Sequence, residues 1–320
     1  MVMMENGRKK KCASGYNKNN KLKVFTAFSG YDSQCMALDT LKTESDFDYE
    51  LVGWSEIDKY AIIAHNTIFP EYKDRNYGDI SKIDWKEVPD FDLFTYSSPC
   101  TSFSQAGLQK GGDEGSGTPS SLLWECRKAI VTKKPKYLLF ENVKALLSDK
   151  FIHVFNKWCK ELEDYGYVNF YQVLNAKDYG IPQNRERVFM VSIKKDDNDT
   201  NPYYEFPEKK NLVKKSVDLL EKHVDEDYYV NKDKQDRYIY YLKEEYPKDE
   251  GLYNEYNDEL FSTNKKQLIK KQMICECQGF GKTDIREGSH LKKQGNPDVI
   301  STITCLCGMN KVVVDIEENI

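Results

Sequence analysis

The sequence predicts an α/β fold built around an open, mostly parallel sheet, and three observations lead to this prediction. Between residues 22 and 194, short apolar runs alternate with segments whose apolar residues recur at helical spacing. Several apolar runs end in small or charged residues, which is typical of the sheet edge where such folds bind ligands. The 320 residues, 39% of them hydrophobic, are also enough for one large core and a smaller second domain.

Six strands and three helices are predicted from these patterns. The strands are expected at residues 22–28, 49–55, 91–96, 137–140, 167–174 and 188–193. One helix is expected around residues 36–41 and another at residues 120–132. The third carries a stripe of large apolar residues that we interpret as core packing, namely Phe151, Phe155, Trp158, Leu162 and Tyr165.

Composition and charge exclude several classes of protein. No apolar run is long enough to span a membrane, and the basic residues 8–11 are not followed by the apolar segment of a secretory signal. Nine cysteines, an odd number, indicate reduced thiols and a cytoplasmic location. The net charge of −5 excludes a uniformly basic nucleic-acid binder, so any contact with DNA requires lysines gathered on one face.

The first predicted strand leads into a glycine turn that suits a nucleotide-type ligand. The turn contains Phe28, Ser29, Gly30, Asp32 and Ser33, and a helix follows it. A tight turn before a helix N-terminus presents backbone N–H groups and the positive end of the helix dipole. Asp32 is also a suitable helix cap, because an aspartate side chain accepts hydrogen bonds from the first helical N–H groups.

Two acidic positions follow later in the predicted sheet. The second strand ends at Glu56 and Ile57, and an acid at the tip of that strand is where folds of this type hold ribose hydroxyls. The alternative for Glu56 is an ordinary surface acid. Asp79 and Ile80 come next, in a Gly-Asp-Ile segment.

Cys100 is the main candidate for chemistry. It lies where the third predicted strand gives way to a glycine-rich loop at residues 105–117, and Pro99 restricts the backbone before it. A thiolate at such a place can act as a nucleophile. The alternative is a buried and inert thiol, which is the commoner fate of a single cysteine.

Three further polar residues lie around the last predicted strands. Glu141 follows the strand at residues 137–140. Arg185 and Arg187 lie just before the last strand, in the pattern Gln-x-Arg-x-Arg that begins at Gln183. Arginines spaced by two point to one face of a strand, so both can reach the same anionic or carbonyl-rich ligand.

Taken together and in this order, these segments resemble the motifs of the DNA (cytosine-5) methyltransferase family. Pro-Cys-Thr-Ser-Phe-Ser at residues 99–104 is similar to the family's Pro-Cys-Gln-x-Phe-Ser, and the family's Glu-Asn-Val and Gln-x-Arg-x-Arg are present in full. The chain departs from the family at Asp32, where a second glycine is usual, and at Pro119, where arginine is frequent.

The resemblance implies the fold and the domain organisation. We expect an α/β, Rossmann-like S-adenosylmethionine-dependent methyltransferase sheet whose last two strands form a hairpin, with a small, incomplete target-recognition domain. The domains are predicted as a basic disordered tail at residues 1–21, a catalytic domain at 22–210, a linker at 211–235 and a partial target-recognition domain at 236–320.

The resemblance also implies S-adenosyl-L-methionine as the cofactor. The glycine turn would wrap its methionine part, Glu56 would hold the ribose, and Ile57, Asp79 and Ile80 would line the adenine pocket. The predicted cofactor-binding residues are Phe28, Ser29, Gly30, Asp32, Ser33, Glu56, Ile57, Asp79, Ile80 and Pro99.

The implied substrate is a cytosine flipped out of duplex DNA. The predicted roles are Cys100 as the nucleophile that adds to carbon 6, Glu141 as a protonated acid that donates to nitrogen 3, and Arg185 as the ligand of the base carbonyl, with Arg187 nearby. The predicted DNA contacts are Ser104, Gln183, Thr302 and Thr304.

No metal site is predicted. Cys275 and Cys277 form one Cys-x-Cys pair, and Cys305 and Cys307 form another. Four thiolates are a possible zinc site. However, both pairs lie in apolar runs in which alternate residues share one face of a strand, whereas zinc ligands more often come as Cys-x-x-Cys at a turn.

The predicted function is methyl transfer to carbon 5 of cytosine in a specific duplex sequence, in bacterial or phage restriction-modification or anti-restriction, within the cytoplasm. Two alternatives remain. The same motifs would serve a tRNA cytosine-5 methyltransferase. The chain would otherwise be an inactive or two-chain DNA-binding subunit, because nothing before Ile320 resembles the family's late motifs. We therefore expect a second polypeptide that supplies them.

Overall fold

The apolar runs of the sequence form strands of a sheet in a computed structural model of the protein. The structure describes residues 16–103, 110–195, 202–214 and 216–219, together with short strands at 4–5, 8–9, 273–278, 290–293, 300–301 and 311–314. The chain divides into two units. The first contains Met1–Leu174 and Glu186–Glu208, and the second contains Asn175–Arg185 and Lys209–Ile320.

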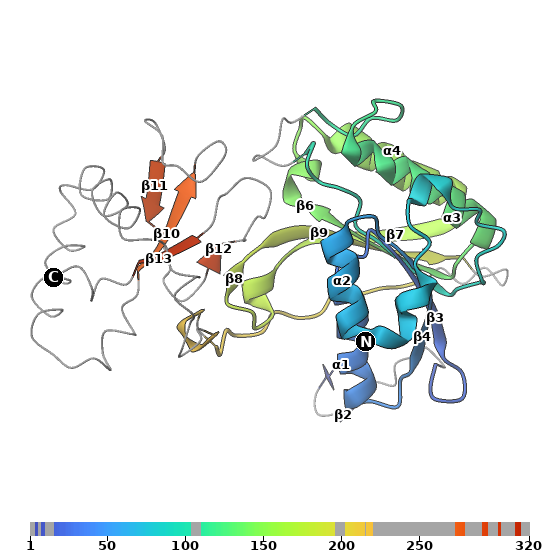
Figure 1. Ribbon diagram of the computed structural model, residues 1–320, viewed down its shortest axis with the longest axis horizontal. Coiled ribbons are helices and arrows are strands. Elements are labelled where there is room, and N and C mark those ends of the chain that lie inside the picture. The colour runs from blue at the N-terminus through green and yellow to red at the C-terminus, as the bar shows by residue number, and fades with distance from the viewer. Residues whose placement is uncertain are drawn as a thin grey trace, which may run out of the picture. The chain divides into compact units, whose positions relative to one another are not determined.

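A six-stranded sheet with the order β4-β3-β5-β6-β9-β7 forms the centre of the first unit (Figure 1). The strands are β3 (Leu22–Ala27), β4 (Tyr49–Ser55), β5 (Leu93–Tyr96), β6 (Tyr137–Val143), β7 (Tyr167–Asn175) and β9 (Glu186–Lys194). The pairs β3–β4, β3–β5 and β5–β6 are parallel, whereas β9 runs antiparallel to β6. The six predicted strands and the α/β fold are therefore confirmed.

The parallel strands define one edge of this sheet, which we call the carboxyl edge because β3, β4, β5 and β6 all end there. The predicted turn at Gly30, the acid Glu56 and the candidate nucleophile Cys100 come after β3, β4 and β5, and the acid Glu141 lies within the last residues of β6. Ligands of open α/β sheets bind at this edge.

Helices cover both faces of the sheet. The α-helices are α1 (Ser33–Glu44), α2 (Lys59–Ile68), α3 (Cys126–Lys133) and α4 (Ile152–Asp164). Shorter 3₁₀ segments are η1 (Pro70–Arg75), η2 (Ile80–Lys82), η3 (Pro119–Glu125), η4 (Lys144–Leu147), η5 (Ala176–Asp178) and η6 (Ser216–Leu219). Residues of α1 and α2 pack in one apolar cluster, and residues of α3 and α4 pack in the other.

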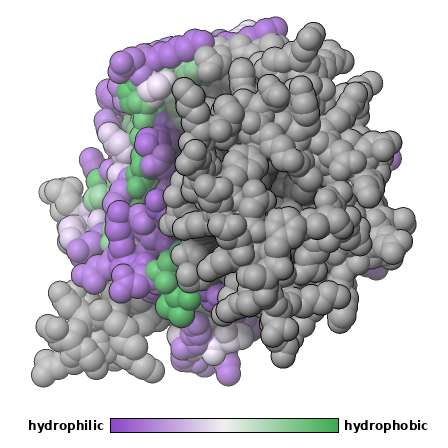
Figure 2. Space-filling view, turned by 90° about the vertical axis from the view of Figure 1, so that its left-hand side faces the viewer, coloured by the Kyte–Doolittle hydropathy of each residue, from purple (hydrophilic) through white to green (hydrophobic). Residues whose placement is uncertain are grey.

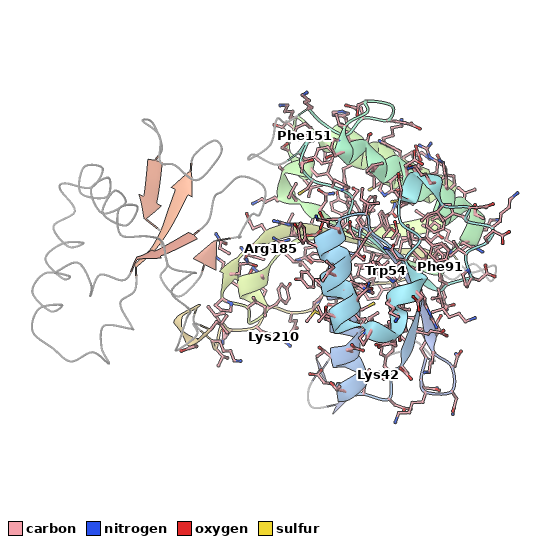
Figure 3. All side chains as sticks on the ribbon, viewed as in Figure 1. Lys42, Trp54, Phe91, Phe151, Arg185 and Lys210 are labelled. Atoms are coloured by element: carbon pink, nitrogen blue, oxygen red, sulfur yellow. The ribbon has the colours of Figure 1, made fainter. Side chains whose placement is uncertain are left out.

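The two apolar clusters follow from the alternation of side chains along the strands. Val24 belongs to one cluster and the next residue, Phe25, belongs to the other. Neighbouring strand residues point to opposite faces, so a sheet covered on both faces has strands that are apolar throughout. Trp54 and Phe91 are buried within the first unit on this pattern (Figure 3).

The predicted apolar stripe of α4 is confirmed as core packing. Val154, Phe155, Trp158 and Leu162 are buried, and the Trp158 indole N–H donates to the Tyr96 hydroxyl at 3.0 Å. A buried indole needs such a partner, since an unpaired N–H inside the core costs free energy.

The helix predicted at residues 120–132 differs in its first half. It begins as the 3₁₀ segment η3 after Pro119, and α-helical geometry starts only at Cys126. The 3₁₀ winding aligns residues three apart, so Ser120 and Leu123 lie on one side and are buried, and the neighbouring Trp124 is buried as well.

The second unit contains two small groups of strands. β10 (Met273–Gln278) lies between β11 (His290–Lys293) and β13 (Lys311–Val314), antiparallel to both. β8 (Gln183–Asn184) pairs in parallel with β12 (Ile300–Ser301). The Gln-x-Arg motif therefore forms a sheet with a segment more than a hundred residues later in the chain.

The region predicted as a tail contains a short antiparallel pair, β1 (Met4–Glu5) with β2 (Arg8–Lys9).

On the face of the molecule in Figure 2, the described residues are mostly hydrophilic, with a few hydrophobic residues exposed between them. Among the described residues, no helix has both the length and the apolar character needed to cross a membrane.

Candidate active site

Cys100 lies in the loop that follows β5, at the carboxyl edge of the sheet. Its side chain is half-buried, and its carbonyl oxygen accepts a hydrogen bond from the N–H of Phe103 at 3.0 Å. Burial raises the pKa of the Cys35 and Cys126 thiols, and that of Cys159 to about 12, so these groups stay protonated at neutral pH.

A pair of buried polar side chains ties the end of β5 to the end of β6. The Asn142 amide donates to the carbonyl oxygen of Ser98 at 3.1 Å and to its hydroxyl at 3.3 Å. Both residues are nearly inaccessible to solvent. Because Cys100 and Glu141 are close neighbours of these two residues in sequence, the bonds bring the thiol segment and the acid to the same place on the carboxyl edge.

Glu141 is held by an arginine from the neighbouring antiparallel strand. The Arg187 guanidinium Nε lies 3.2 Å from Glu141 Oε1, and both side chains are largely shielded, at 16% and 22% exposure. Strand pairing fixes the approach, since Val143 lies opposite Arg187 and Glu141 lies opposite Phe189. Arg187 therefore orients the carboxyl group, and the sequence pattern placed both residues among the candidates.

The loop returns to the core beside the aromatic ring of Phe103. Gly112 packs so closely there that an added Cβ would lie 2.4 Å from the ring, which permits only glycine. The Trp124 indole donates to the Gly112 carbonyl at 2.8 Å. Phe103 also makes an edge-to-face contact with Phe151, which begins the α4 segment (Figure 3).

Ion pairs hold the next residues of the loop against α3 and α4. The Glu114 carboxylate lies 2.7 Å from Arg127 and 2.7 Å from Lys157. Hydrogen bonds from Arg127 and then Lys157 lower the pKa of Glu114 to about 2, so the carboxylate keeps its charge throughout the neutral range. The part of the loop that returns to the core is thus held at several points.

The predicted cofactor turn is joined to the end of the second strand. The Gly30 N–H donates to Glu56 Oε2 at 2.9 Å, and Glu56 Oε1 accepts from the N–H groups of Ile57 and Asp58 at 2.8 and 2.9 Å. Gly30 has a positive φ of 58°, as glycine readily adopts. The Ile57 side chain is 71% exposed, beside this turn.

Asp32 caps α1 from a fully buried position. Its carboxylate accepts from the Thr26 hydroxyl at 2.7 Å and the Cys35 N–H at 3.2 Å, and its Oδ2 lies 3.5 Å from His65 Nε2. The His65 ring stacks on Trp54 with the ring centres 3.7 Å apart. Asp32 keeps a left-handed backbone, with φ of 66°, which glycine would adopt at lower cost.

The Gly-Asp-Ile segment lies at the end of the second strand. The carbonyl oxygen of Gly78 accepts from the Ser55 hydroxyl at 2.6 Å. Hydrogen bonds from the Ser81 hydroxyl and N–H hold the pKa of the half-buried Asp79 carboxyl below its usual value. Ile80 is buried in the apolar core.

The residues present around the turn fit a polar ligand. The Ser29 hydroxyl is buried and has no hydrogen-bond partner within the protein. A Cβ added at Gly30 or at Gly78 would meet no other atom within 4 Å, so there is open space beside both glycines. Phe28 and Pro99 are half-buried, and Ser33 is exposed at the start of α1.

Gln183 and Arg185 belong to the second unit (Figure 3). The side-chain oxygen of Asn175 accepts from the Arg185 N–H at 3.1 Å, and its amide donates to Asn184 at 2.8 Å. These bonds close the segment that carries Gln183 and Arg185 into a loop. The predicted DNA contacts Ser104, Thr302 and Thr304 lie outside the described residues.

Sequence reasoning missed several residues that organise these sites. Asn142 stood within the recognised Glu-Asn-Val pattern, so its position was a usable signal. His65 lay in a segment for which no helix was predicted, Ser120 lay on a predicted helix, and neither carried a pattern that marked it. Only the packing of distant segments brings their side chains to the cofactor turn and to the Cys100 loop.

Comparisons with known proteins agree with this arrangement. The family model described as C-5 cytosine-specific DNA methylase matches residues 22–305. The type II methyltransferase M2.ScrFI of Lactococcus lactis subsp. cremoris is 37% identical over 306 residues, covering 78% of this chain and 81% of that protein. The orphan methyltransferase M.SPRI of Bacillus phage SPR is 35% identical, covering 67% of this chain but 53% of its own length. This chain thus spans about half of that phage protein.

Solved structures are similar in fold. The structure of Entamoeba histolytica methyltransferase EhMeth matches with a TM-score of 0.53 at 19% identity, over 67% of this chain and 64% of that chain. The Dnmt2 methyltransferase of S. pombe matches with a TM-score of 0.50 at 20% identity, over 69% and 66%. At this level of identity the likeness supports the fold alone.

Two substitutions of Asp32 test its role beneath the turn. Asp32→Gly removes an acceptor from two buried donors, which costs about 1–3 kcal/mol of unfolding free energy. Asp32→Ala adds about 1–2 kcal/mol more, because alanine resists the left-handed backbone. Urea unfolding measures both, with Asp58→Ala, at the exposed cap of α2, as the control. Equal stability of the Gly and Ala variants would contradict the role of the backbone.

Proposed function

We propose that this chain, which belongs to the C-5 cytosine-specific DNA methylase family, methylates a cytosine flipped out of a specific duplex sequence and uses Cys100 as its nucleophile. The observation that carries the proposal is the joint position of the Cys100 loop and Glu141 on the carboxyl edge, with Asn142 tied to Ser98 between them.

Family membership confirms the predictions of a Rossmann-like methyltransferase fold, of S-adenosylmethionine as the cofactor, and of carbon 5 of cytosine in DNA as the acceptor. The relatives named above are a type II methyltransferase and an orphan phage methyltransferase. We therefore assign this chain to modification of DNA in the cytoplasm of a bacterium or of a phage-infected host.

S-adenosylmethionine supplies an electrophilic methyl group when it is bound. The proposed site for it is the turn at Phe28, Ser29 and Gly30, with the buried Ser29 hydroxyl still able to make a hydrogen bond. Glu56 is proposed to hold the ribose while it keeps the turn in place through Gly30. The remaining proposed residues are Ser33, Ile57, Asp79, Ile80 and Pro99 around the ligand, and Asp32 beneath the turn.

The proposed reaction begins with the Cys100 thiolate. Its attack forms a sulfur–carbon 6 bond and moves an electron pair to the base, which makes carbon 5 nucleophilic enough to take the methyl group. Glu141, oriented by Arg187, donates a proton to nitrogen 3 and so removes the negative charge that attack creates. Arg185 is proposed to bind the base carbonyl. The methyl group would come from the sulfonium of S-adenosylmethionine, which would leave as a neutral thioether. Loss of the carbon 5 proton to a base, with return of the nitrogen 3 proton to Glu141, then expels the Cys100 thiolate.

The proposed partner is duplex DNA. Extruding a base costs about a few kcal/mol, which contacts to the surrounding DNA must supply. Gln183, on a strand that pairs with the segment at Ile300, is proposed to contribute such contacts, and so are Ser104, Thr302 and Thr304. No step involves a membrane.

A second polypeptide is proposed to cover the cofactor turn. Large apolar side chains are exposed at the turn, on α1 and on α2, namely Tyr31, Met36, Ile57, Tyr60 and Ile63. Exposed apolar side chains that gather in one region can mark a place where another segment binds. A fragment carrying the family's late motifs is the proposed occupant.

The first test is Cys100→Ser. An alcohol is far less acidic than a thiol and cannot supply the attacking anion, so 5-methylcytosine formation should be lost while cofactor and duplex affinities stay within a few-fold. Bisulfite sequencing of mixed-sequence duplex and of tRNA, each incubated with the protein, measures the product. Turnover near the wild-type rate in the serine variant would remove Cys100 from the mechanism, and methylation of tRNA alone would favour the RNA substrate.

The second test is Glu141→Gln. Glutamine keeps the shape and can donate a hydrogen bond, but it cannot deliver a proton, so the rate should fall about 10²–10⁴-fold. Glu186→Gln is the matched control, since Glu186 is exposed on β9 and pairs with Lys144, which follows β6. Equal rates for the two variants would exclude Glu141 as the proton donor.

The third test concerns the second polypeptide. The 320-residue chain is assayed at saturating S-adenosylmethionine, first alone and then with a fragment that carries the late motifs. Activity that arises only with the fragment, together with tighter cofactor binding by calorimetry, is the expected result. Sequence-specific methylation by the chain alone would rule out the need for a second polypeptide.

A further inference from the structure

The buried hydroxyl group of Ser120 is hydrogen-bonded to the peptide groups on both sides of Cys100. Ser120 Oγ donates a hydrogen bond to the carbonyl oxygen of Pro99 at 2.6 Å and accepts one from the N–H of Ser102 at 3.1 Å. Ser120 comes from η3, so these bonds link positions 21 and 18 residues apart in the chain. Only Cys100 and Thr101 lie between the two bonded peptide groups.

The surroundings of Ser120 keep these two hydrogen bonds in place. The residue is fully buried, so water does not compete for its hydroxyl. The position where Gly112 would carry a Cβ lies 3.1 Å from the Ser120 Cβ, which leaves little room for movement. A hydrogen bond that is shielded from solvent is both stronger and more costly to lose than an exposed one.

A second contact holds the same segment from the other side. Asn142 binds the carbonyl oxygen and hydroxyl of Ser98, two residues before Cys100. The segment from Ser98 to Ser102 is therefore fixed by side chains from β6 and from η3. Its backbone geometry depends on these two residues rather than on strand pairing, because β5 ends at Tyr96.

We propose that Ser120 is a positioning residue for the nucleophile. By holding the backbone on both sides of Cys100, its hydroxyl sets the direction in which the Cys100 thiolate points toward carbon 6. This inference rests on the proposed function of Cys100. A misplacement of the reacting atoms by about 1 Å can cost roughly 10²-fold in rate. Loss of the two Ser120 hydrogen bonds should therefore lower the rate of the chemical step.

The neighbouring serine provides a matched control. Ser121 Oγ donates to the carbonyl oxygen of Thr118 at 2.7 Å, within its own turn of η3. Ser121→Ala removes a hydroxyl and a hydrogen bond from the same segment, but it does not touch the Cys100 loop. Any general weakening of η3 should therefore affect the Ser121 and Ser120 variants alike.

The experiment compares Ser120→Ala, Ser120→Cys and Ser121→Ala. Ser120→Ala should lower kcat about 10²-fold, while KM for S-adenosylmethionine and the Kd for duplex stay within about threefold. Ser120→Cys, which keeps the volume and a weak donor, should fall between Ala and wild type. Ser121→Ala should keep wild-type kcat. The thermal unfolding midpoint of each variant shows whether it is folded. If Ser120→Ala is not folded, the kcat of Ser120→Cys is compared with that of Ser121→Ala instead.

A second readout separates this inference from the proposed function. Alkylation of Cys100 by iodoacetamide, followed by mass spectrometry across a pH series, reports the thiol directly and needs no methyl transfer. The rate and its pH profile should change in the Ser120 variants and stay unchanged in Ser121→Ala. If the wild-type chain methylates nothing but alkylation changes as described, only the proposed function fails. Unchanged kcat and unchanged alkylation in folded Ser120 variants would overturn the positioning role.

Discussion

The parallel pairing of β5 with β6 is the constraint on which the proposed active site depends. Tyr96, the last residue of β5, lies opposite Phe140 in this pair, so the segment after β5 leaves the sheet beside the last residues of β6, which include Glu141. Both aromatic rings are buried, with their centres 5.3 Å apart, and Tyr96 also accepts the hydrogen bond of Trp158. A slip of one residue in this register would move one of the two rings to the opposite face of the sheet and so separate the pair.

The proposed cofactor turn depends in the same way on the parallel pairing of β3 with β4. The two strands end with Ala27 opposite Ser55, which brings the turn and Glu56 together, and the Gly30–Glu56 hydrogen bond then fixes their distance. Beneath the turn, a buried carboxylate takes the place of the glycine that is usual in the family. Asp32 tolerates the left-handed backbone because Thr26, Cys35 and His65 surround its side chain.

The loop that carries the nucleophile differs from both, because side chains rather than strand pairing hold it. Ser120 and Asn142 fix its start, and Gly112, packed on Phe103, fixes its return. These contacts keep the segment that carries Cys100 in a fixed position. Ser120 and Trp124 both come from η3, and both are buried where they bind this loop.

The sequence by itself located the six strands of the sheet and the candidate residues at its edge. Apolar periodicity located the six strands, and the residues at their ends identified Cys100, Glu141, Glu56 and the glycine turn, because a parallel sheet gathers its strand ends at one edge. Local residue patterns also pointed to Asp32 as a helix cap. These features depend on neighbours in sequence, which a pattern can show.

Only the tertiary structure decided what holds these residues in place. Ser120 contacts the Cys100 segment across about twenty residues, and His65 reaches Asp32 from another helix. Arg187 was among the candidates, yet its pairing with Glu141 depends on the antiparallel register of β6 and β9. Such contacts carry no periodicity or motif, because they arise when segments distant in sequence pack together and bury their polar groups in pairs.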